Sequence, residues 1–82
     1  MQFWEQELAL TEAAALRIEA IEAEAERRFD KALAVAEGNG EPGIATRMAE
    51  FRDWMSARAD TDAAWGRWAE VMHARPASAA RD

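Results

Sequence analysis

The chain has 82 residues, no cysteine and a net charge of −6, with 16 acidic and 10 basic side chains. A chain of this length forms one small domain, and without cysteine neither a disulfide nor a thiolate metal site can stabilise it. The acidity and the lack of a clustered basic tract argue against direct binding to nucleic acid, and no apolar run approaches the ~20 residues of a membrane span. The N-terminal sequence lacks the basic and apolar regions of a signal peptide, so we expect a cytoplasmic protein.

Small side chains dominate the apolar half of the composition. Alanine supplies 21 of the 41 apolar residues, which leaves only 20 larger ones. So few large side chains give a lone small domain a marginal core. We therefore expect self-association to contribute to its stability.

Residues 3–37 are predicted to form the first helix. This segment contains no glycine or proline and is rich in alanine, glutamate, arginine and leucine, which favour helices. Its apolar residues recur at alternating spacings of four and three, the heptad pattern of a helix that packs along one seam. The predicted seam consists of Trp4, Leu8, Thr11, Ala15, Ile18, Glu22, Ala25, Phe29, Ala32 and Ala36. Glu22 is its one charged member.

Most of the net charge belongs to this first helix, because residues 1–37 carry nine acids and four bases. Four glutamates recur every seven residues beside the seam, and we call them the acidic ridge. The ridge is interpreted either as a solvated flank or as a docking surface for a basic partner. Its members are Glu5, Glu12, Glu19 and Glu26.

Residues 38–43 (Gly-Asn-Gly-Glu-Pro-Gly) form a dense group of turn-forming residues. We expect them to reverse the chain, with Pro42 in the first turn of the next helix. A short tail at residues 76–82 is expected to be disordered, so that residues 1–75 form the domain.

A second helix is predicted at residues 44–74. A second heptad seam runs along it without a slip, so we favour one continuous helix. The alternative is a break near residues 60–62, where Asp60-Thr61-Asp62 could cap a third helix. Gly66 also lowers the stability of a continuous helix by ~1 kcal/mol relative to alanine. The predicted seam consists of Ile44, Met48, Phe51, Met55, Arg58, Asp62, Trp65, Ala69 and Met72.

Folding the two helices antiparallel across the turn predicts their register. Residues whose numbers add to about 80 then lie opposite each other, so that Phe29 meets Phe51 and Glu22 meets Arg58. The charged members of the two seams therefore coincide. We expect Glu22, Arg58 and Asp62 to form a structural polar layer that sets the register.

The apolar surface is broader than one hairpin needs. Trp54 and Trp68 lie beside the second seam, and Phe3, Leu10 and Ile21 flank the first. Such broad stripes are typical of bundles in which each helix has two neighbours. The simplest closure is a homodimer that forms a four-helix bundle, and the alternative is a monomeric three-helix bundle. The candidate interface aromatics are Trp4, Trp54, Trp65 and Trp68.

The sequence offers little for catalysis. It has one histidine and no tyrosine, and we find neither a Ser–His–acid arrangement nor a glycine-rich phosphate loop. Glu70 and His73 form a Glu-x-x-His pattern like that of di-iron helical bundles, and the hairpin would bring Glu7 near His73. The alternative is a surface histidine that suits the C-terminal end of a helix. We expect no enzymatic activity, cofactor or metal, with Glu70 and His73 as the remaining metal candidates.

These features lead to three functional hypotheses. The first is a non-enzymatic protein–protein interaction module that acts as a homodimer and binds another protein. The second is an acidic inhibitor of a nucleic-acid-binding host or defence protein, of the kind that phages and mobile elements use, in which the ridge mimics phosphates. The third is a dimeric metal-carboxylate bundle.

Overall fold

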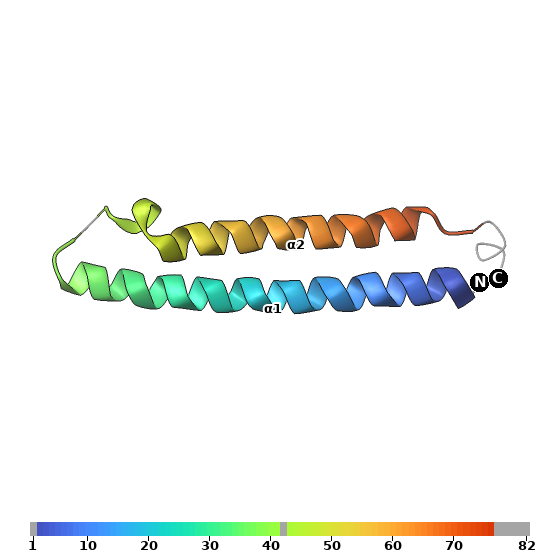
Figure 1. Ribbon diagram of the computed structural model, residues 1–82, viewed down its shortest axis with the longest axis horizontal. Coiled ribbons are helices and arrows are strands. Elements are labelled where there is room, and N and C mark those ends of the chain that lie inside the picture. Colours follow the sequence, from blue (N-terminus) through green and yellow to red (C-terminus); the bar gives the residue numbers. More distant parts are fainter. Residues whose placement is uncertain (1, 42, 77–82) are drawn as a thin grey trace.

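The computed structural model describes residues 2–41 and 43–76, which form a long antiparallel hairpin of two helices (Figure 1). Helix α1 spans Gln2–Gly38, a short 3₁₀ helix η1 spans Ala45–Arg47, and helix α2 spans Ala49–His73. The predicted all-α hairpin is confirmed. Neither described helix is long and apolar enough to cross a membrane. The tail expected at residues 76–82 lies, apart from Pro76, outside the described residues.

Glycine ends helix α1. Gly40 has a φ of 76°, a left-handed conformation that glycine adopts without steric cost. The N–H of Gly40 donates to the carbonyl of Glu37 at 3.1 Å, and the N–H of Glu41 donates to the carbonyl of Ala36 at 3.0 Å. This pair of bonds is a Schellman motif, which satisfies the last carbonyls of a helix. The predicted end of the first helix is therefore right to within one residue.

The connection to α2 is longer than predicted, because the second helix begins at Ala49 and not at residue 44. Gly43 has a φ of 81°, and after one 3₁₀ turn Met48 adopts an extended backbone with a ψ of 144°. An extended residue interrupts the helical hydrogen bonds, so the heptad pattern at Ile44 and Met48 does not lie on α2. Pro42 lies outside the described residues.

Helix α2 continues through residues 60–66 without a break, as the favoured prediction had it. Thr61 does not cap a new helix. Its hydroxyl donates instead to the carbonyl of Ala57 at 3.1 Å, one turn earlier in the same helix.

The α1 seam is confirmed, since all ten of its predicted members are buried or half-buried. Ala15 is completely buried, and Phe29 is the one large side chain in the buried core of the described residues. The predicted contact between Phe29 and Phe51 is present, with ring centroids 5.4 Å apart. The register of the hairpin is therefore right at this level.

The predicted α2 seam is wrong by one residue in its middle. Arg58 and Asp62 are exposed, whereas Ala57, Thr61 and Ala64 are buried. The predicted polar layer is absent from the described hairpin, because half-buried Glu22 forms no ion pair with Arg58 or Asp62 there. The physical reason is that an uncharged row lies one position away on the same helix, and burying it costs less than desolvating two charges.

Candidate interaction surfaces

Aromatic side chains pack inside the hairpin at two levels. Near the loop, Phe29 stacks on Trp54 with centroids 5.4 Å apart, and Arg58 lies 5.8 Å from the Trp54 ring. Near the termini, Trp65 and Trp68 meet edge to face at 5.6 Å. All four tryptophans are half-buried. Trp54 and Trp68, predicted to flank the seam, are spaced by three and four residues from buried Ala57 and Ala64, so they belong to the row of α2 that packs on α1.

The indole N–H groups differ in their partners. Trp4 donates to the carbonyl of Val71 at 2.7 Å, which ties the start of α1 to the end of α2. The N–H groups of Trp54 and Trp68 are buried and have no partner among the described residues. A buried donor without a partner costs about 1–3 kcal/mol. At these two positions, this cost offsets part of the stabilisation that aromatic packing gives.

The acidic ridge lies on the surface of α1, and all four of its glutamates are exposed. Because α1 is one uninterrupted helix, seven residues separate successive glutamates by about 10 Å along its axis. The ridge is therefore a straight row of carboxylates that is accessible to a partner.

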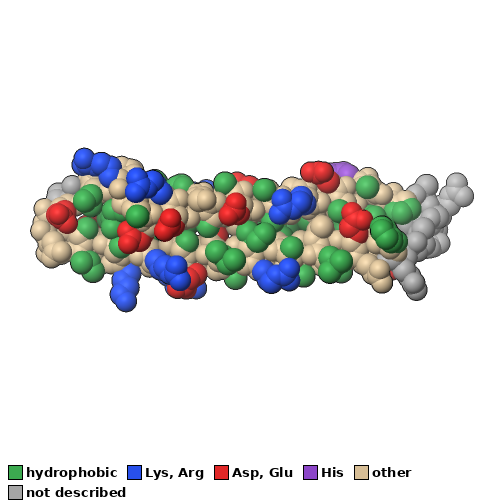
Figure 2. Space-filling model, in the orientation of Figure 1, with side chains coloured by type: hydrophobic (Ala, Val, Ile, Leu, Met, Phe, Trp, Pro, Cys, Tyr) green, Lys and Arg blue, Asp and Glu red, His purple; other side chains and the backbone are tan. Residues whose placement is uncertain are grey.

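A mixed apolar and charged row runs along the opposite flank of α1. We call it the α1 flank strip, defined as the positions reached from Phe3 by alternating steps of four and three residues up to Val35. Four large apolar side chains on it are exposed: Phe3 by 79%, Leu10 by 70%, Ile21 by 63% and Val35 by 59%. Figure 2 shows one long face of the molecule, on which hydrophobic side chains alternate with acidic and basic ones. An apolar row this exposed is typical of an interaction surface.

Shallow hollows line the boundary between the α1 flank strip and α2. Ile21 faces Ala57 and Asp60 across one of them, and Arg28 and Val35 lie in another with Glu50. The α2 wall of these hollows combines exposed polar side chains with small or half-buried apolar ones. The polar members are Asp53, Ser56, Asp60, Arg67 and Glu70, and the apolar members are Ala57, Ala63, Val71 and Ala74. The large exposed apolar side chains on this side belong to α1.

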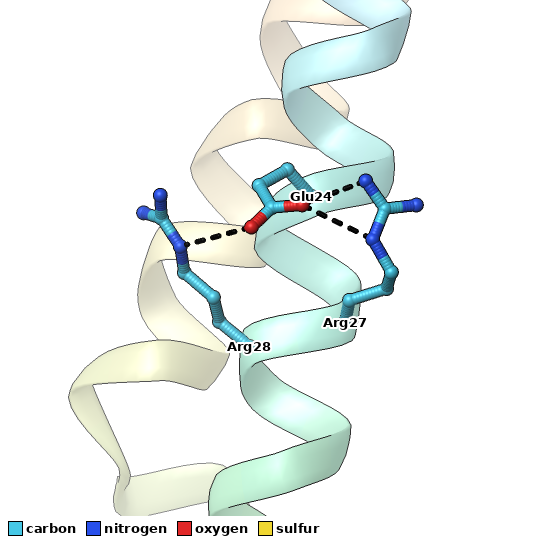
Figure 3. A network of polar contacts seen from close by, with 3 residues as sticks. All are labelled: Glu24, Arg27 and Arg28. Atoms are coloured by element: carbon cyan, nitrogen blue, oxygen red, sulfur yellow. Dashed lines mark hydrogen bonds and ion pairs between the residues drawn. The ribbon is translucent and has the colours of Figure 1, made fainter.

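Glu24, a member of the strip, is neutralised by two arginines of its own helix (Figure 3). Arg27 donates to one carboxylate oxygen through Nε at 3.1 Å and Nη2 at 2.7 Å, and Arg28 Nε lies 3.5 Å from the other oxygen. The hydrogen bond and charge of Arg27 hold the pKa of Glu24 below its ordinary value. The cluster of Glu24, Arg27 and Arg28 therefore keeps one net positive charge.

The metal candidates do not converge. Glu70 is exposed, and the His73 ring is hydrogen-bonded through Nδ1 to the carbonyl of Ala69 at 2.9 Å. No group of three or more metal-ligating side chains exists among residues 2–41 and 43–76. The position of His73 in the last turn of α2 matches the surface interpretation.

Comparisons with known proteins find no matching family model, curated sequence or solved structure. Sequence reasoning found the N-terminal half of the flank strip (Phe3, Leu10 and Ile21) but missed Val35. Continuing the same heptad positions along α1 would have found it.

Proposed function

We propose that this protein is a non-enzymatic interaction module that acts as a homodimer and docks another protein through the acidic ridge. The observation that carries the proposal is the division of α1 into two exposed flanks, one with large apolar side chains and one with four glutamates. A cytoplasmic location and the four-helix bundle expected from the sequence are part of the proposal.

The thin core of the hairpin supports self-association. The buried apolar core of the described residues consists of four alanines and Phe29, and no side chain larger than alanine is fully buried. Two helices that pack mainly through alanine bury little apolar area, so their stability is marginal. A second copy would remove further apolar surface from water.

The acidic ridge supports docking of a basic partner. Exposed carboxylates in a straight row raise the rate of association with a positively charged surface and align it along the helix. The outer faces of a dimer would carry two such ridges.

A second candidate function rests on the same ridge. A row of carboxylates on a rigid helix could occupy the nucleic-acid groove of a binding protein, as phosphate mimicry requires. The two candidates differ in one measurable respect: an inhibitor of this kind competes with nucleic acid for its target, whereas a general docking module does not.

Reversal of the ridge tests the proposal. The variant Glu5→Lys, Glu12→Lys, Glu19→Lys and Glu26→Lys should lose partners captured from the native host, because their binding depends on the negative row. Wild-type binding should weaken with added salt, which screens exposed charges.

The matched control reverses four exposed acids outside the ridge, which changes the net charge by the same amount. Its residues are Glu37, Glu41, Asp62 and Glu70. The control should keep its partners. Equal, salt-insensitive capture by both variants would show that the ridge is only a solvated flank.

A further inference from the structure

We propose that a second copy of this chain packs antiparallel on the α1 flank strip, with α1 against α1 and the two loops at opposite ends. This inference rests on the proposed homodimer and names the surface through which the dimer forms. In this dimer the two copies run antiparallel, and α1 of each copy forms the interface.

The exposure of the strip is the first reason. Phe3, Leu10, Ile21 and Val35 are each more than half exposed, and they are spread over almost the full length of α1. Of the large hydrophobic side chains that are strongly exposed, only Leu16 and Met72 lie elsewhere in the described residues. An occupant that covers the strip must therefore be long and straight, as a second α1 is.

The sequence of the strip is the second reason, because its spacing is the same when read from either end. An antiparallel copy therefore brings Phe3 opposite Val35 and Glu7 opposite Lys31. The first pair is apolar on both sides, and the second joins opposite charges. Both pairs occur twice in a symmetric dimer.

The inner pairs are also compatible. They join Leu10 with Arg28, Ala14 with Glu24, and Arg17 with Ile21. Arginine covers apolar neighbours with its aliphatic stem, and the carboxylate of Glu24 is already held by arginines of its own helix. No pair of the antiparallel arrangement places like charges opposite each other.

The competing arrangements are less favourable. A parallel copy aligned on the same strip would place Glu7 opposite Glu7 and Lys31 opposite Lys31, and like charges in contact oppose association. An arrangement with α1 on the α2 side of the next copy would set the apolar residues against exposed Asp53, Asp60 and Glu70.

The available area suffices for a stable dimer. A helix of 37 residues is about 55 Å long and about 10 Å wide, so α1 alone presents roughly 550 Å² on each copy, or about 1,100 Å² for the pair. A biological protein interface should bury more than about 1,000 Å² in total, counted over both partners. The face can therefore hold a second copy without contributions from the loops.

Disulfide cross-linking tests the orientation, because the described chain and its full sequence contain no native cysteine. The single variants Glu7→Cys and Lys31→Cys are mixed and oxidised. We expect a disulfide-linked dimer in the mixture and none with either variant alone. In the antiparallel dimer the two copies of position 7 are separated by about 24 residues, or roughly 36 Å.

The matched control uses Glu12→Cys and Glu26→Cys, which an antiparallel copy would bring to one level but which lie on the acidic ridge. This mixture should remain uncross-linked. Cross-linking of Glu7→Cys with itself, or of the ridge pair, would overturn the proposed surface or orientation while leaving the homodimer intact. A wild-type chain that sediments as a monomer at all concentrations would overturn both proposals.

Discussion

Replacement of Phe29 by alanine is the sharpest test of how the hairpin is held together. Phe29 is only 6% exposed and contacts the rings of Phe51 and Trp54, each at a centroid distance of 5.4 Å. The substitution removes the one large side chain from the buried core of the described residues. It should therefore destabilise the loop-proximal half of the hairpin.

The magnitude follows from two contributions. Burying a phenylalanine side chain is worth about 1.5–3 kcal/mol, and each aromatic contact adds about 0.5–1.5 kcal/mol. The expected loss of unfolding free energy is about 3–5 kcal/mol, the range found for such core substitutions. For a domain of this size, each kcal/mol lowers the Tm by about 4–8 °C, so the Tm should fall by at least ~12 °C.

Thermal and urea denaturation followed by circular dichroism measure this loss. Wild type and variant must be compared at one protein concentration, because self-association stabilises the folded state by mass action. The control is Leu16→Ala, since Leu16 is 51% exposed and lies outside the seam, the ridge and the flank strip. It should cost less than about 1 kcal/mol. Equal, small effects of both substitutions would refute the placement of the core at Phe29.

Two further predictions concern the helix end and the ion-pair cluster. Gly40→Ala should lower the free energy of unfolding by about 1–2 kcal/mol, because Gly40 has a φ of 76°. Gly66→Ala should raise it by about 0.5–1 kcal/mol, since an added Cβ meets no atom there. Urea titration of each variant measures the sign of the change. Arg27 lowers the pKa of Glu24 in the folded state, so this ion pair stabilises the fold above the unfolded-state pKa and is lost as the pH falls through the folded-state pKa. Glu24→Gln should therefore lower the Tm slightly at neutral pH and not in strong acid. Glu26→Gln, which lies outside that cluster, serves as the control. A fall in the Tm of Glu24→Gln that is the same at all pH values would contradict the stabilising role of the ion pair.

The predictions for α1 were accurate because one signal dominates there. The seam row contains one charged residue, Glu22, whereas the flank strip contains five, so the cost of desolvation leaves one way to orient the helix. All ten predicted seam residues are buried or half-buried. Gly40 then ends the helix through its left-handed conformation. Local propensity and packing favour the same structure along this segment.

Two competing rows on α2 explain the error there. The predicted row passes through Arg58 and Asp62, and a second row, one residue earlier, passes through Ala57, Thr61 and Ala64. Both rows have heptad spacing, so periodicity alone does not choose between them. The cost of desolvating two charges does, which is why the hairpin buries the uncharged row.

The positions of the two α1 surfaces also bear on how the proposed dimer could act. Successive residues of a helix are 100° apart, so Ile21 on the flank strip and Glu19 on the ridge point in nearly opposite directions. A second copy on the strip would therefore cover apolar side chains and leave every ridge glutamate in solvent. Because each ridge points away from the strip, the two ridges would lie on outer faces of the assembly. Because the copies run antiparallel, the ridges would run in opposite directions. A basic partner would then contact the same row of carboxylates on either side of the dimer. Self-association and partner binding would therefore not compete for the same surface of α1.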